Sequence, residues 1–229
     1  RVWEAPDIMR WSTRMRSCRL LATGFSMGIV LHHDFMAMFF WPSGRQAPSK
    51  DKQGYEAIAA FTVMSFNLRY DNAEDYRHGR GWEHRRAAVA ALIAKHEADI
   101  VGIQEGLAGQ LRQLQSDLLE SNANYSSCGV ARDLYLGWFP TGEHCAILFR
   151  RDSVDCLEES TFALSETPSR LGSRSWDSAC PRIATYGWFR IRRAEEGADE
   201  RSPCLCALLL NTHLDHRSEQ ARAEGSRLI

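Results

Sequence analysis

The clearest pattern along the chain is an apolar run, a helix-length segment and a second apolar run. Residues 59–66 are rich in apolar, aromatic and β-branched side chains, which predicts a central strand. Residues 82–96 have an amphipathic, alanine-rich pattern, which predicts a helix. Residues 99–104 are largely apolar, which predicts a second strand buried on both faces. This order of elements is typical of a β-α-β unit.

The hydrophobic pattern changes after residue 124. A helical period covers residues 107–119, and a polar helix rich in arginine and glutamate is expected at residues 216–228. Several stretches between these helices have the composition of strands and turn-rich boundaries. They are residues 125–130, 143–150, 154–164, 182–192 and 205–212. Helices followed by many strands favour an α+β fold with a mostly antiparallel sheet.

Residues 1–58 differ in composition from the rest, so the folded domain is expected to span residues 59–229. Residues 8–33 contain no acid, and arginines precede the apolar run at residues 20–31, a pattern typical of targeting segments. A polar break at residues 32–34 argues against a membrane-spanning helix. The first 58 residues are therefore expected to be a disordered extension or a targeting segment, with mitochondrial targeting as one alternative.

Charge and cysteine usage narrow the class of protein. Lysine and arginine number 28 against 29 acidic residues, so there is no overall basic surface, and a polyanionic substrate would need a local patch or a metal ion. The seven cysteines are irregularly spaced and form neither a disulfide framework nor a paired zinc motif. This usage favours a reducing compartment such as the cytoplasm.

Candidate chemistry lies at the predicted strand ends. Asn67 and Glu105 follow the two strands of the β-α-β unit and should share one rim of a sheet, where their oxygens suit Mg²⁺. Arg182 begins a later strand, and its planar guanidinium suits a phosphate. Glu143 begins another strand and His213 ends a third; an imidazole held by a carboxylate can move a proton near neutral pH. Each residue alone has an ordinary structural interpretation, but together they indicate one site.

These motifs, in this order, resemble the endonuclease/exonuclease/phosphatase superfamily, which includes deoxyribonuclease I, and are most similar to its deadenylase-type branch. The segments that carry the resemblance are 65–69 (SFNLR), 99–105 (DIVGIQE), 142–147 (GEHCAI), 175–182 (SWDSACPR) and 211–215 (NTHLD). The resemblance covers about residues 60–229 and implies a four-layer α/β/β/α sandwich of the deoxyribonuclease I type.

The resemblance also implies an activity and a set of roles. It implies hydrolysis of a phosphodiester or phosphomonoester, such as RNA or DNA, with Mg²⁺ or Mn²⁺ as cofactor and an RNA 3′–5′ exonuclease as the favoured subtype. The implied metal residues are Glu105 and its neighbour Asn67. The implied catalytic residues are Asn67, Glu143, His213 and Asp215, and the implied substrate-binding residues are Trp176, Asp177, Arg182 and Asn211. No protein partner is indicated.

The later Gly-Asp-Phe-Asn and Ser-Asp-His motifs of the superfamily have no match in residues 1–229. The chain therefore resembles the first half of the domain, and is expected to form about one sheet with its helices. One alternative is an inactive scaffold or binding fragment of the same fold. Another is a zinc site at residues 212–216, which resembles the metallo-β-lactamase motif but has Leu214 where that motif has a histidine.

Overall fold

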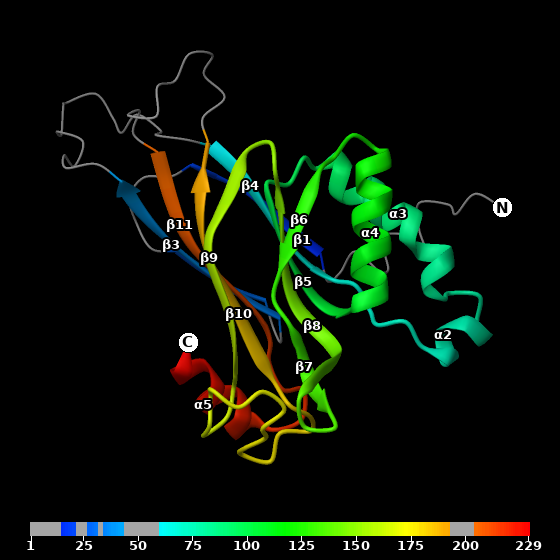
Figure 1. Ribbon diagram of the computed structural model, residues 1–229, viewed down its shortest axis with the longest axis vertical. Helices are drawn as coiled ribbons and strands as arrows, with labels where there is room; N and C mark the ends of the chain where they lie inside the picture. The colour runs from blue at the N-terminus through cyan, green and yellow to red at the C-terminus, as the bar shows by residue number, and fades with distance from the viewer. Residues whose placement is uncertain (1–14, 22–26, 32–33, 44–59, 193–203) are drawn as a thin grey trace.

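The computed structural model describes residues 15–21, 27–31, 34–43, 60–192 and 204–229. Within these residues, two β-sheets pack face to face and helices lie outside the larger sheet (Figure 1). The first three ranges form strands within the predicted extension. The other residues of that extension lie outside the described ranges, so its disorder or targeting role stays a prediction.

The larger sheet is mixed and has the order β1-β4-β5-β8-β6, with β7 paired to β8. Its strands are β1 (Met15–Leu21), β4 (Ala60–Asn67), β5 (Ile100–Leu107), β6 (Tyr125–Cys128), β7 (Ala131–Tyr135) and β8 (Phe139–Arg150). Strands β4 and β5 are parallel, and α3 (Trp82–Lys95) lies between them in the chain. The predicted β-α-β unit is confirmed.

The second sheet is antiparallel and has the order β2-β3-β11-β10-β9. Its strands are β2 (Met27–Leu31), β3 (Asp34–Ser43), β9 (Val154–Ala163), β10 (Ile183–Ile191) and β11 (Cys204–His213). The expectation of about one sheet is therefore wrong. Phe189 and Leu209 on this sheet are fully buried against the apolar inner face of the first sheet, so both sheets are built before residue 229.

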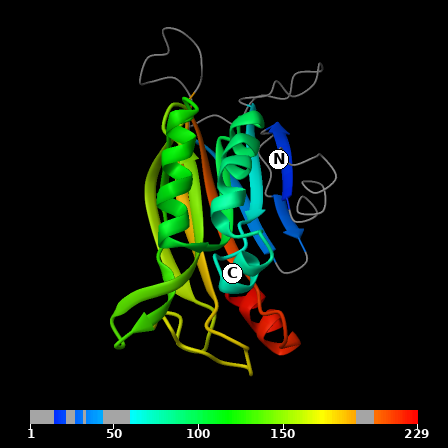
Figure 2. The ribbon, with the colours of Figure 1, turned by 90° about the vertical axis from the view of Figure 1, so that its right-hand side faces the viewer.

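Helices α3 and α4 (Ala108–Glu120) cover the outer face of the larger sheet (Figure 2). Their contact is apolar around Trp82 and Leu114, and an ion pair between Arg86 and Asp117 joins the two helices. Helix α5 (Glu219–Leu228) packs near Leu164 at one end of the second sheet, so the fourth layer of the sandwich is short. No helix in the described part of the chain is long and apolar enough to cross a bilayer.

Candidate active site

Asn67 and Glu105 meet where the parallel strands β4 and β5 end. Asn67 Nδ2 donates a hydrogen bond of 2.9 Å to Glu105 Oε1, and the backbone N–H of Tyr70 donates one of 3.3 Å to Oε2. Asn67 Oδ1 in turn accepts a hydrogen bond of 2.9 Å from the backbone N–H of Arg69. Both carboxylate oxygens of Glu105 are therefore anchored, and the predicted proximity of the two residues is confirmed.

A β-bulge positions Glu105. The pairing of β5 with β8 shifts register between Ile103 and Gly106, and Glu105 lies in this irregularity with a left-handed φ of 59°. That conformation costs a non-glycine residue about 1–3 kcal/mol. Bulges are frequent beside active sites because they redirect a side chain. Here the hydrogen bonds to the carboxylate stabilise the redirected conformation.

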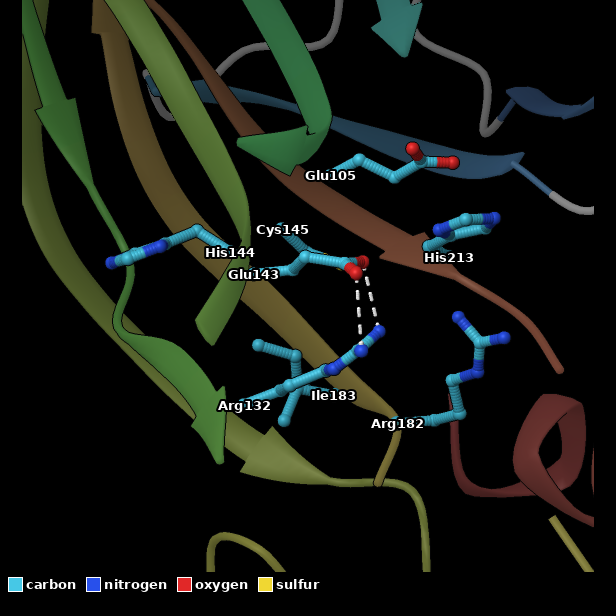
Figure 3. Close-up of a pocket in the computed structure, with 8 residues that line it drawn as sticks. All are labelled: Glu105, Arg132, Glu143, His144, Cys145, Arg182, Ile183 and His213. Atoms are coloured by element: carbon cyan, nitrogen blue, oxygen red, sulfur yellow. Dashed lines mark hydrogen bonds and ion pairs between the residues drawn. The ribbon is translucent and has the colours of Figure 1, made fainter. Parts of the chain in front are cut away.

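A small pocket opens at this rim, between the ends of both sheets (Figure 3). It is lined by Glu105 of β5, Arg132 of β7, Glu143, His144 and Cys145 of β8, Arg182 and Ile183 at the start of β10, and His213 of β11. Figure 3 shows Glu105, Glu143, Arg182 and His213 around a common space, while the ring of His144 points away from Glu143. The structure therefore brings together four of the residues that the sequence singled out.

Arg132 holds Glu143 in this pocket. Its Nη1 donates a hydrogen bond of 2.8 Å to Oε2 of Glu143, and its Nη2 donates one of 3.1 Å to Oε1. Burial raises the pKa of Glu143; the charge of Arg132 lowers that pKa, and the neighbouring charge of Glu105 raises it. A carboxyl group with a raised pKa, beside cations, is suited to proton transfer. Arg132 was missed because it lies in a short, polar hairpin strand that the hydrophobic pattern does not mark.

Arg182 is 5% exposed, and hydrogen bonds to Asp215 and His216 fix its guanidinium. Its Nε donates a hydrogen bond of 3.2 Å to Asp215 Oδ2, and its Nη2 donates one of 2.9 Å to His216 Nδ1. Asp215 does not line the pocket, and its contact suits it to orienting Arg182, while a catalytic role stays a prediction. The alternative of a zinc site at residues 212–216 does not fit this arrangement, because Asp215 and His216 both hydrogen-bond to Arg182.

The protonation state of Asp215 follows from its surroundings. The residue is 1% exposed, and three backbone N–H groups donate hydrogen bonds of 2.8, 2.9 and 3.0 Å to its carboxylate. Burial raises the pKa of Asp215, but these hydrogen bonds and that of Arg182 outweigh burial and hold the pKa well below its usual range. Asp215 is therefore a fixed negative charge beneath Arg182.

Asn211 lies in the interior between the two sheets. It is 0% exposed, and its Oδ1 accepts a hydrogen bond of 2.6 Å from Gln104. Its Nδ2 donates bonds of 2.9 and 2.8 Å to the backbone carbonyl oxygens of Ile103 and Ala146. This position separates Asn211 from the pocket, so we assign it a role in joining the sheets in place of the predicted substrate contact.

Trp176 and Asp177 shape the loop that precedes Arg182. Both have left-handed backbone conformations, with φ of 56° and 55°, and neither lines the pocket. The carbonyl oxygen of Trp176 accepts a hydrogen bond of 2.6 Å from Ser218 Oγ, which fastens the loop to the start of α5. The structure thus gives these two residues a position beside the site, and direct substrate binding by them stays a prediction.

The divalent cation that the sequence predicts needs oxygen ligands at this rim. Within the described ranges, no three His, Cys, Asp or Glu side chains gather into a metal cluster. Mg²⁺ usually keeps several waters and binds one or two protein carboxylates, so the anchored carboxylate of Glu105 fits it. The Oδ1 atom of Asn67 is already hydrogen-bonded to Arg69, which suits Asn67 better to orienting Glu105 than to holding the ion.

Comparison with known proteins decides the family. Residues 64–220 match the Endonuclease/Exonuclease/phosphatase family. The chain belongs to this family. The predicted family membership is confirmed, and with it the expectation of a phosphoesterase fold; the narrower placement in the deadenylase-type branch stays a prediction. A comparison with curated proteins found no match.

Three bacterial structures resemble this member of the family. A mannosyl-6-phosphatase from Bacteroides thetaiotaomicron is 35% identical, with a TM-score of 0.61 over 72% of this chain and 56% of that one. A family protein from Bacteroides vulgatus is 34% identical, with a TM-score of 0.59 over 72% of this chain and 56% of that one. A conserved protein of unknown function from Enterococcus faecalis is 29% identical, with a TM-score of 0.57 over 72% and 57%. The chain thus spans a little over half the length of these relatives.

Proposed function

We propose that the full-length protein is a divalent-metal-dependent phosphoesterase that acts on a phosphomonoester. The observation that carries this proposal is the pocket shared by Glu105, Glu143, Arg182 and His213. The similarity to the mannosyl-6-phosphatase supports a phosphomonoester over a phosphodiester. The chain covers 56% of that relative, so residues beyond this segment are expected to contribute to the complete site.

In this reaction a water molecule attacks phosphorus, the bond from phosphorus to the alcohol oxygen breaks, and the products are an alcohol and inorganic phosphate. Arg182 would bind phosphoryl oxygens through its free guanidinium edge, in an orientation fixed by Asp215 and His216. Glu143, with its raised pKa, and His213 would transfer protons at the water and the leaving oxygen. Glu105 would hold the cation. When bound, the cation would neutralise the negative charge that develops on the phosphoryl oxygens.

Phosphate release by the full-length protein tests this proposal. Phenyl phosphate and hexose 6-phosphates should be hydrolysed with Mg²⁺ or Mn²⁺ and not with a chelator. Glu105→Gln and Arg182→Gln should each lower kcat/KM by about 100-fold or more, because each removes charge stabilisation from the transition state. Arg112→Gln, an exposed change on α4, is the matched control and should retain full activity. Chelator-resistant hydrolysis, or full activity in Glu105→Gln, would contradict the proposal.

The same experiment also tests the more specific predictions made from the sequence. A 5′-labelled RNA added as a parallel substrate tests the predicted 3′–5′ exonuclease subtype, which would shorten it one nucleotide at a time. Failure of the full-length protein to hydrolyse any of these substrates would favour the alternative of an inactive scaffold.

A further inference from the structure

A second, larger groove adjoins the candidate active site. It has a volume of about 660 Å³ and lies between the β7–β8 hairpin and the loop at residues 164–181. Figures 1 and 2 show this hairpin and this loop at the same end of the molecule. Ligand pockets in proteins are commonly 300–1,000 Å³, so the groove is large enough for a small organic molecule.

The groove and the active-site pocket share a wall. Arg132 lines the pocket and Asp133 lines the groove; Arg182 lines the pocket and Pro181 lines the groove. Arg132 Nε also donates a hydrogen bond of 3.3 Å to Asp133 Oδ2, so a pocket residue and a groove residue are directly linked. The pocket itself encloses about 10 Å³, so the alcohol part of a substrate has to lie outside it. The groove is the adjoining space in which that part would lie.

The loop that forms one wall of the groove is held by its own hydrogen bonds. Ser165 Oγ and Ser173 Oγ are 2.6 Å apart, and the backbone N–H of Glu166 donates a bond of 3.0 Å to Ser175 Oγ. The backbone N–H of Arg170 donates a bond of 3.0 Å to the carbonyl oxygen of Thr167. These hydrogen bonds fix the shape of the wall, and it presents the exposed side chains of Glu166 and Arg170 to the groove.

The charged side chains of the groove are balanced, two acids against two arginines. Asp133 is paired with Arg132, and Arg174 donates to the carbonyl oxygen of Ser178. Arg170 forms no ion pair within the part of the chain that the structure describes. Glu166 and Arg170 therefore offer an acceptor and a donor, which match adjacent hydroxyl groups because a hydroxyl both donates and accepts. A polyanion would instead require a surplus of positive charge.

Two exposed aromatic residues follow a residue that lines the groove. Gly137 lines the groove, and its neighbour Trp138 is 68% exposed, with its ring centroid 4.5 Å from that of Phe139. An exposed aromatic face beside polar groups suits a pyranose ring, whose edge carries hydroxyls and whose face carries C–H groups.

We propose that this groove binds the sugar of a phosphorylated monosaccharide, with Glu166 and Arg170 hydrogen-bonded to its hydroxyls and its phosphate directed to Arg182. This inference rests on the proposed phosphomonoesterase function and specifies its substrate class.

The test compares substrates on Glu166→Gln, Arg170→Gln and Trp138→Ala in the full-length protein, with Arg112→Gln as control. For mannose 6-phosphate and glucose 6-phosphate, each groove variant should raise KM about tenfold and change kcat less than about twofold. For phenyl phosphate, which has no hydroxyls, Glu166→Gln and Arg170→Gln should leave both constants unchanged. Calorimetric titration of hexose 6-phosphate into metal-free protein should show the same loss of affinity and needs no turnover.

The outcomes separate the two proposals. If no phosphomonoester is hydrolysed but the groove variants still weaken hexose 6-phosphate binding, the proposed function fails and the sugar site stands. If hydrolysis is normal and the Glu166 and Arg170 variants change hexose and phenyl phosphates equally, the sugar site is overturned. It is also overturned if Arg170→Gln weakens binding of a short oligoribonucleotide and leaves hexose 6-phosphate binding unchanged.

Discussion

The side-chain nitrogen of Asn67 lies 2.9 Å from a carboxylate oxygen of Glu105, although 38 positions separate these residues in sequence. The contact forms because the two residues end parallel strands that pair directly, Asn67 opposite Gln104. Backbone N–H of Tyr70 fixes the other carboxylate oxygen. The direction of the Glu105 carboxylate is therefore set by Asn67 and the backbone of Tyr70.

Asn67→Ala should weaken binding of a divalent cation at Glu105. Loss of the partner that orients a metal-binding carboxylate typically costs about 10–100-fold in metal affinity. Mn²⁺ binding to the full-length protein, followed by electron paramagnetic resonance, measures this directly. Asn122→Gly is the matched control, because Asn122 is exposed in a remote turn with a φ of 58°, which glycine adopts easily. Equal Mn²⁺ affinities in the two variants would contradict the assigned role.

Asp215→Ala should destabilise the protein by about 3–5 kcal/mol, because it leaves the buried guanidinium of Arg182 without its counter-charge. The lowered pKa of Asp215 also predicts the pH dependence. Its stabilisation is fully present above the pKa of an unfolded aspartate, about 4, and is lost as the pH falls below that value. Urea unfolding at neutral pH and at about pH 3 measures both effects.

A surface ion pair provides the comparison for Asp215. Asp152 is 3.7 Å from Arg150 and its side chain is 56% exposed, so Asp152→Asn should cost less than about 1 kcal/mol at either pH. If Asp215→Ala were as mild as Asp152→Asn, the buried pair would not be what stabilises this end of the sandwich.

The sequence predicts much of the site because strand ends can be identified from the hydrophobic pattern. Asn67, Glu105, Arg182 and His213 all lie at such ends, and the structure brings them to one rim. Arg132 could not be found in this way, since β7 is a short hairpin strand with polar residues and its pairing with β8 is irregular. Its role depends on a contact with Glu143 that no local pattern reveals.

The hydrophobic pattern also does not predict how the strands divide between two sheets. Alternation along residues 154–164, 182–192 and 205–212 predicts strands, but not which strand each one pairs with. The structure pairs β10 with β9 and β11, and this sheet buries Ala207 and Leu209 against the first. A short helix, α2 (Ala73–Arg77), forms in a polar segment that the hydrophobic pattern does not mark, because Asn72 caps its first turn.

Replacement of Arg132 should raise the pKa of Glu143 further. Burial already raises this pKa, and the adjacent positive charge of Arg132 partly offsets that effect. In Arg132→Gln the offset is lost, so Glu143 should bind its proton up to a higher pH than in the natural protein. Carbon-13 NMR titration of the glutamate carboxyl groups measures the change. The exposed control Arg112→Gln should leave the pKa of Glu143 unchanged. An equal shift of this pKa in Arg112→Gln would argue against a local effect of Arg132.

Asn211→Ala should destabilise the sandwich without any change at the pocket surface. The substitution leaves the carbonyl oxygens of Ile103 and Ala146 and the amide of Gln104 without this partner in a buried space. Each buried polar group that loses its hydrogen bond costs about 1–3 kcal/mol. Urea unfolding gives the total, and Asn211→Asp would keep the shape but bury a charge. Wild-type stability in Asn211→Ala would show that the two sheets do not depend on this contact.

The half-buried thiol of Cys156 should be more reactive than the buried thiol of Cys145. Cys128 on β6 and Cys156 on β9 interact across the outer strands of the two sheets, and the hydrogen bond from Cys128 lowers the pKa of Cys156. Burial raises the pKa of Cys145 to about 12. Because the thiolate is the nucleophile, iodoacetamide at about pH 8 should label Cys156 at least about 100-fold faster, measured by mass spectrometry of the peptides. Cys128→Ala removes the donor and should slow labelling of Cys156; unchanged labelling would mean that the two thiols do not interact.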